Sequence, residues 1–157
     1  MPIKVDYPDS VPAWMEITDP IGIGGIMDQF GYFHDSCLRD FHLSTRAFVN
    51  HNLSMTLDNE ITAVLLFQRQ FNTNAVLELK FVDVVGFNYQ PPPKNYNEVI
   101  YDAVFEKTDG VYYWADHQEW TLSGFQNGDV ESVWIGGRKL YYRWRPALLG
   151  NVARFPE

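Results

Sequence analysis

A period-two alternation of apolar and polar residues constrains the fold of this chain most strongly, and it dominates from about residue 37 onward. Successive side chains on a strand face opposite sides, so this spacing favours strands over helices. In residues 77–81, leucine and phenylalanine alternate with charged residues, as in a strand with one buried face. Residues 61–71 contain a continuous apolar run at 64–67, which predicts a strand buried on both faces.

Further strands are predicted on both sides of these two. Leu53, Met55 and Leu57 alternate with polar residues and predict another half-buried strand. The proline run 91–93 ends the first group of strands, because proline has no N–H to donate to a sheet.

Two glycine-containing turns then predict hairpins. Asp109-Gly110 would join strands at 99–107 and 111–115, and Gly136-Gly137 would join strands at 130–135 and 139–144.

The N-terminal third is less regular. Residues 10–15 predict a helix of one or two turns, with Ser10 as its cap and Pro12 in its first turn. Residues 21–25 are rich in glycine and predict a loop. No linker or repeat divides the chain, so residues 1–157 are expected to form a single domain. We predict a mainly β fold of about seven or eight strands with a short N-terminal helix: an antiparallel curved sheet, a sandwich or an open barrel.

The charge balance narrows the class of partner. The net charge is −8, and the densest basic stretch, residues 138–145, alternates with aromatic residues as on the charged outer face of a strand. Nucleic-acid binding requires clustered cations, so we predict no nucleic-acid partner and favour a basic protein instead. A single cysteine, Cys37, excludes an internal disulfide. No segment has the apolar length of a signal peptide or a membrane span, so we expect no membrane association and a cytoplasmic location.

Two histidine–aspartate pairs are the candidate chemical groups. His34-Asp35 and Asp116-His117 could together supply imidazoles and carboxylates for a metal ion or for acid–base catalysis. Adjacent residues on a strand face opposite sides, however, and short polar side chains commonly stabilise turns at strand ends. We therefore predict no metal and no cofactor, and keep a metal-dependent enzyme as an alternative.

Aromatic residues make up 16% of the chain and crowd its last third. Alternation predicts that Trp114 and Trp134 share one face of the sheet, and Trp120 follows in a loop. Buried, these rings would belong to the core. Exposed, they would mark a protein interface or a surface that stacks on sugars.

One stretch resembles a known group of proteins. Phe33-His34-Asp35-Ser36-Cys37-Leu38, followed by the alternating segments 53–57 and 77–84, resembles small uncharacterised bacterial β-rich proteins, some of which are immunity proteins of polymorphic-toxin systems. The resemblance covers residues 30–87 and supplies no catalytic residues. It implies a protein that binds and masks a toxin.

These observations lead to a non-enzymatic, cytoplasmic protein-binding module as the predicted function, with masking of a basic toxin as its specific form. A carbohydrate or small-ligand module that uses exposed Trp and Tyr is the alternative from a second class. The candidate binding residues are His34, Asp35, Trp114, Asp116, His117, Trp120 and Trp134.

Overall fold

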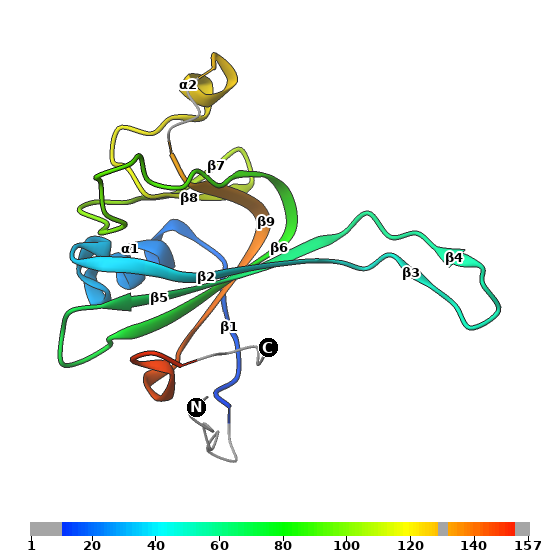
Figure 1. Ribbon diagram of the computed structural model, residues 1–157, viewed down its shortest axis with the longest axis horizontal. Helices are drawn as coiled ribbons and strands as arrows, with labels where there is room; N and C mark the ends of the chain where they lie inside the picture. The colour runs from blue at the N-terminus through cyan, green and yellow to red at the C-terminus, as the bar shows by residue number, and fades with distance from the viewer. Residues whose placement is uncertain (1–10, 129–131, 153–157) are drawn as a thin grey trace.

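The computed structural model describes residues 11–128 and 132–152, which form a mainly β structure (Figure 1). Seven of the described strands form an antiparallel sheet: β1 (Met15–Ile17), β2 (Ser36–Thr45), β5 (Ile61–Arg69), β6 (Val76–Asn88), β7 (Val104–Thr108), β8 (Val111–Ala115) and β9 (Trp134–Trp144). Two short strands, β3 (Phe48–Val49) and β4 (Met55–Thr56), pair only with each other. The predicted antiparallel β class is confirmed, and the sheet is open rather than closed into a barrel.

The strand order in the sheet is β2-β5-β6-β9-β8-β7. Strand β9 pairs with β6 along its whole length, from Trp134 opposite Asn88 to Trp144 opposite Leu77. Its other edge is divided between two partners, because residues 134–137 pair with β8 and residues 140–142 pair with β1. Strand β9 therefore joins the two halves of the sheet.

Gly136-Gly137 lies inside β9, so the prediction of a hairpin turn at this position is wrong. The glycines are required by packing rather than by a turn. A Cβ atom at Gly136 would lie 2.6 Å from Cε1 of Tyr113, and one at Gly137 would lie 3.0 Å from Cβ of Phe81. A glycine inside a strand marks such a close approach, which the sequence pattern alone does not separate from a turn.

The sheet coils strongly where β6 and β9 cross this region (Figure 1). The pairing register of β6 shifts between Val84 and Gly86, and Asp83 just before the shift has a φ of 57°. Such a bulge bends a strand and increases its twist. The β7–β8 half of the sheet consequently turns over the concave face of the other half.

Helix α1 (Pro20–Gln29) fills the concave side of the sheet. Its Ile23 and Ile26, together with Phe30 and Phe33 after it, pack into a core with Trp114 of β8. Phe33 itself closes a 3₁₀ turn, η1 (Gly31–Phe33). The ring centroids of Phe33 and Trp114 lie 5.8 Å apart.

The structure corrects the predicted positions of the N-terminal elements. The predicted loop at 21–25 is helical, because Asp19 caps the helix by accepting a hydrogen bond from the Gly22 N–H at 2.9 Å and Pro20 stands in its first turn. The helix predicted at 10–15 is not observed in residues 11–15, and Met15 begins a strand. Ser10 lies outside the described residues.

The opposite face of the sheet contains a buried charge cluster. Glu78 is 1% exposed, and its carboxylate accepts hydrogen bonds from Arg143 at 2.8 Å and from Arg145 at 2.7 Å. Arg145, at 7% exposed, is followed by the 3₁₀ turn η2 (Pro146–Leu148), whose Leu148 packs over Leu66 and Val76. The prediction that residues 138–145 form a charged outer face is therefore wrong at Arg145.

The predicted half-buried strand at 53–57 is also wrong. Leu53, Met55 and Leu57 are 84%, 65% and 74% exposed, and only Met55–Thr56 is a strand. These residues belong to a hairpin extension, residues 46–60, which we call the arm and which projects away from the sheet (Figure 1). Alternation predicts strands correctly but does not show whether anything covers their apolar side.

Replacing Gly136 by alanine should lower the free energy of unfolding by about 1–3 kcal/mol, because Tyr113 is packed too tightly to give way to a Cβ atom. Gly24→Ala in α1 is the matched control, since a Cβ atom there meets nothing within 4 Å and alanine favours a helix. Urea denaturation measures both, and equal stability of the two variants would contradict this account of β9.

Replacing Glu78 by glutamine should lower the free energy of unfolding by about 3 kcal/mol, because two guanidinium groups would lose their buried counter-charge. Glu60→Gln removes an acid of the same type from a solvent-exposed pair with Arg46 and should cost less than about 1 kcal/mol. Chemical denaturation distinguishes the two, and a small loss at Glu78 would show that the cluster contributes little to stability.

Candidate functional site

A long connection between β6 and β7, residues 89–103, lies over one end of the coiled sheet and is called here the proline loop. It is held by local hydrogen bonds, by a backbone hydrogen bond to the sheet, and by the burial of Ile100 and Ala103 in the core. The Tyr96 N–H donates to the carbonyl of Pro93 at 3.0 Å, and the Val99 N–H donates to Oδ1 of Asn97 at 3.1 Å. The Ile100 N–H donates to the carbonyl of Ser36 at 2.8 Å, which ties the loop to the start of β2.

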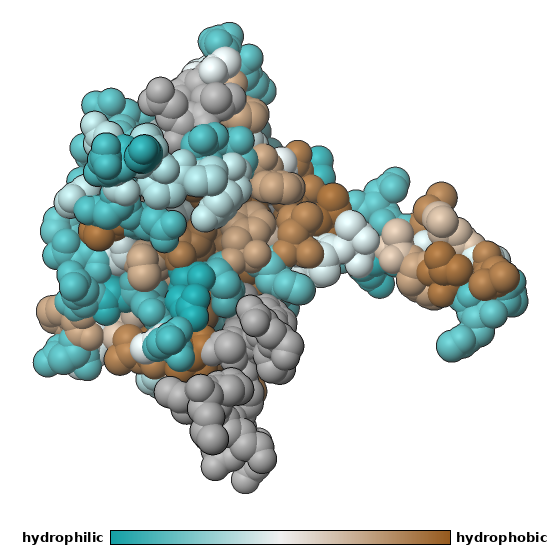
Figure 2. Space-filling model, in the orientation of Figure 1, coloured by the Kyte–Doolittle hydropathy of each residue, from teal (hydrophilic) through white to brown (hydrophobic). Residues whose placement is uncertain are grey.

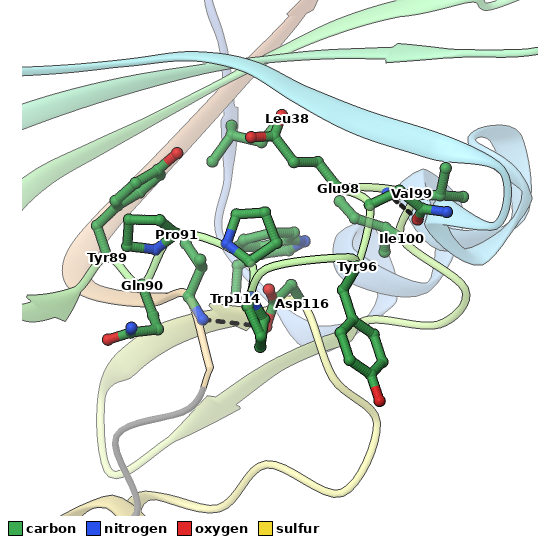
Figure 3. Close-up of a pocket in the computed structure, with 14 residues that line it drawn as sticks. Leu38, Tyr89, Gln90, Pro91, Tyr96, Glu98, Val99, Ile100, Trp114 and Asp116 are labelled. Carbon is green, nitrogen blue, oxygen red and sulfur yellow. Dashed lines mark hydrogen bonds between the residues drawn. The ribbon is translucent and has the colours of Figure 1, made fainter.

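A pocket of about 210 Å³ opens between the proline loop, β2 and the end of β8 (Figure 3). Most of its lining comes from the proline loop. Its lining residues are Leu38, Tyr89, Gln90, Pro91, Pro92, Pro93, Tyr96, Asn97, Glu98, Val99, Ile100, Trp114, Asp116 and Val133. Two of these, Trp114 and Asp116, are candidate residues from the sequence.

The lining combines two carboxylates with aromatic rings. Figure 3 shows Glu98 extending from the proline loop toward Leu38, whereas Asp116 lies on the other side, just beyond β8. Tyr89 and Trp114 line the pocket, the exposed ring of Tyr96 points away from it (Figure 3), and none of the described lining residues is basic. Carboxylates and aromatic faces together are the groups that bind organic cations.

Asp116 is fixed by the backbone of residue 133. Its Oδ1 accepts a hydrogen bond from the Val133 N–H at 3.0 Å, and its own N–H donates to the Val133 carbonyl at 3.0 Å. Burial raises the pKa of Asp116, and the Val133 hydrogen bond opposes this shift. A carboxylate that is partly desolvated in this way gains from the approach of a cation.

The three candidate tryptophans, for which the sequence left both burial and exposure open, are buried. Trp114 is 0%, Trp120 5% and Trp134 4% exposed, so these rings belong to the core, and the alternative of a sugar-stacking surface built from them is not supported. Trp134 lies opposite Ala115, not opposite Trp114, and therefore faces the other side of the sheet from Trp114. On that side the centroid of its ring lies 5.4 Å from the ring centroid of Trp120 and 4.8 Å from that of Phe125. Phe125 belongs to the short helix α2 (Leu122–Gln126).

The histidine–aspartate pairs do not form a joint site. Nδ1 of His34 lies 3.1 Å from Oδ2 of Asp35, and both side chains are at least half exposed in the turn before β2. His117 is exposed, and its Nδ1 accepts a hydrogen bond from the Glu119 N–H at 3.2 Å. Within 11–128 and 132–152, no group of three or more His, Cys, Asp or Glu residues is placed to hold a metal ion. The alternative of a metal-dependent enzyme that combines both pairs is thus not supported.

Comparison with known proteins found no family model, no curated protein and no solved structure that matches this chain. Among the described residues, no helix has the length and apolar character needed to cross a membrane.

Sequence reasoning missed most of the pocket, including Glu98, Tyr89 and Tyr96. The available signal was the length of the connection, because ordered loops of about 15 residues are uncommon and are often functional. The proline run indicated a chain break, but it also stiffens a wall of the pocket.

The contribution of Asp116 to the stability of the chain should fall as pH rises from about 4 through its raised pKa, because the folded state holds that proton more firmly than the unfolded chain. Above the folded-state pKa, the Asp116 contribution becomes constant. Asp116→Asn keeps an acceptor for the Val133 N–H and should remove this part of the pH dependence. Denaturation across this pH range tests the prediction, with Asp109→Asn in an exposed turn as the control. Parallel curves for native chain and Asp116→Asn would contradict it.

Proposed function

We propose that this protein is a binding module that recognises a basic protein by seating one cationic side chain in the pocket under the proline loop. The observation that carries the proposal is that two carboxylates, Asp116 and Glu98, line one hollow together with Tyr89 and Trp114, with no basic residue in the described lining. The net charge of −8 supports it, because an acidic molecule attracts a basic partner over a distance and speeds association.

The pocket has a volume suited to a single side chain, about 210 Å³, and only together with the hollow beside it does it reach the range of about 300–1,000 Å³ that is typical for drug-sized molecules. A lysine or arginine side chain fits the pocket by itself and brings its own positive charge. A polysaccharide would require a longer, open surface, and Trp114, Trp120 and Trp134 are too buried to form one.

A second hollow continues the pocket along β2. It is lined by Leu38, Arg39, Asp40, Phe41 and Tyr89, and it adjoins the first because Leu38 and Tyr89 line both. An extended peptide that places a cation beside Asp116 could continue along this second hollow. This continuity supports a protein partner rather than a free amine.

The specific form of the proposal is an immunity protein that masks a basic toxin in the cytoplasm. It rests on the resemblance of residues 30–87 to β-rich bacterial proteins and on the acidic balance of the chain. Masking requires binding alone, so the pocket has no catalytic role in this proposal.

The proposal predicts that N-acetyl-argininamide binds the pocket and that N-acetyl-citrullinamide, its neutral counterpart, does not. Titration followed by backbone amide NMR should shift the signals of Tyr89, Tyr96 and Asp116 with the first compound. Asp116→Asn and Glu98→Gln should each weaken binding at least about tenfold, because each removes one charge from the site.

Glu106→Gln on the exposed face of β7 is the matched control and should bind as the native chain does. Binding should weaken as salt concentration rises, since the attraction is between charges near the surface. Equal binding of the citrulline compound, or shifts confined to residues outside the pocket, would contradict the proposed function.

A further inference from the structure

Strand β2 forms one open edge of the sheet. Within residues 11–128 and 132–152, β2 pairs with β5 on one side, and its other side meets the chain at a single bridge, Ser36 opposite Ile100. The backbone N–H and C=O groups along such an edge can pair with a strand of another chain. The outer edge of β2 is therefore a candidate docking surface.

The pairing with β5 shows which backbone groups of β2 point outward. The Gln70 N–H donates to the carbonyl of Asp35 at 3.1 Å, whereas the carbonyl of Ser36 accepts a hydrogen bond on the opposite side, from the Ile100 N–H at 2.8 Å. In an antiparallel pair this direction alternates from residue to residue, so it can be counted along β5 past the register shift in β2. The residues of β2 whose N–H and C=O point outward are then Leu38, Phe41 and Leu43.

The pocket occupies the place where a neighbouring strand would continue. Ile100 pairs with Ser36 in the antiparallel direction, so Glu98, two residues before Ile100, would lie opposite Leu38 in a continued pairing. Instead the proline loop moves away from β2, and Glu98 and Leu38 line the pocket (Figure 3). The second hollow follows the same strand from Leu38 to Phe41. The two hollows thus lie one after the other beside β2.

The side chains beside this edge change from acidic to apolar along the strand. Glu98 and Asp116 line the pocket at the start of β2. Farther along, the surface where β6 bends beside β2 is hydrophobic (Figure 2). Phe87 of β6 is 45% exposed there, and its ring centroid lies 5.6 Å from that of Phe41. A peptide on this edge would therefore meet carboxylates first and apolar side chains next.

One basic side chain, Arg39, is among the described lining residues of the two hollows. Its Nη2 donates hydrogen bonds to Oδ1 of Asn151 and to the carbonyl of Val152, both at 3.3 Å. The guanidinium of Arg39 is thus directed toward the last described residues of the chain. Its charge is not paired with the two carboxylates of the pocket, which remain the groups that a cation would meet.

We propose that the basic partner binds as a β-strand added to the outer edge of β2, with a lysine or arginine side chain in the pocket and an apolar side chain two residues away in the second hollow. This inference rests on the proposed function and specifies its mode of recognition. Residues two positions apart on a strand point to the same face and lie about 7 Å apart. In such complexes the backbone hydrogen bonds supply affinity, and the hollows select the side chains.

The peptide acetyl-Thr-Arg-Thr-Leu-Thr-amide tests the proposal against N-acetyl-argininamide, which can fill the pocket but is too short to form a strand. The peptide should bind at least about tenfold more tightly. The control is the same peptide methylated on the backbone nitrogens of its middle threonine and its leucine. Adjacent residues of a strand direct their N–H groups to opposite edges, so one of the two methyl groups must face β2, and this peptide should bind no better than N-acetyl-argininamide.

Amide hydrogen exchange of the full chain, followed by NMR, locates the contact. Saturating peptide should slow exchange at Phe41 and Leu43 at least about tenfold, because their outward N–H groups become hydrogen-bonded. N-acetyl-argininamide should leave these two amides unchanged. His42 and Ser44, whose N–H groups point toward β5, are the internal control and should exchange at the same rate in every sample.

The outcomes separate this inference from the proposed function. If N-acetyl-argininamide binds the pocket but the peptide binds no more tightly and leaves Phe41 and Leu43 unprotected, strand addition is overturned and the proposed function stands. If neither compound binds, both proposals fail. Protection of these amides in the chain alone that increases with its concentration would place a second copy on the edge, and it would also overturn the inference.

Discussion

The pairing of β6 with β9 is the interaction on which the rest of this structure depends. The two strands remain paired from Leu77 opposite Trp144 to Asn88 opposite Trp134, through a bulge that bends both halves of the sheet toward each other. Gly136 and Gly137 allow this course, because side chains there would collide with Tyr113 and Phe81. The bend brings the β7–β8 hairpin over α1, and it sets the end of β8 beside the proline loop.

Two acids of this fold lie in contrasting environments. Glu78 is buried and accepts hydrogen bonds from Arg143 and Arg145, so its charge is neutralised within the fold. Asp116 is partly buried with a backbone N–H as its hydrogen-bond donor, and the pocket beside it has no basic residue in its described lining. Burial without a compensating guanidinium raises the pKa of Asp116, and it leaves a carboxylate that gains from an incoming cation. The desolvation of Asp116 is unfavourable in the free protein, and a bound cation would offset it.

Alternation in the sequence predicted the fold class well, because strands in a half-covered sheet must alternate. Strands β5 and β6 lie close to their predicted positions, and Asp109-Gly110 forms the predicted turn. Gly136-Gly137 was misinterpreted because the need for glycine comes from Tyr113, which lies on the neighbouring strand β8 but more than twenty residues away in the sequence. Helix α1 was predicted as a loop because glycine is unfavourable in a helix. Asp19 and Pro20, however, are typical residues for a helix start. At both Gly136-Gly137 and α1, contacts with residues far away in the sequence determine the structure, and a local sequence pattern does not contain them.

The candidate site was predictable only in part, for the same reason. Trp114 and Asp116 were identified as candidates, but Glu98 reaches the pocket through a loop whose path depends on the Ser36–Ile100 contact. His34 and Asp35 were candidate site residues from the sequence, but they lie in an exposed turn. Local sequence identifies reactive residue types, whereas their convergence is a property of the folded sheet.

The most direct test of the cation-binding account is the carboxyl carbon NMR signal of Asp116, followed across pH with and without N-acetyl-argininamide. The account predicts that the pKa of Asp116 falls when the cation is bound, because a positive charge beside the carboxyl group stabilises its ionised form. A pKa that stays the same at saturating ligand would contradict the claim that this pocket seats a cationic side chain.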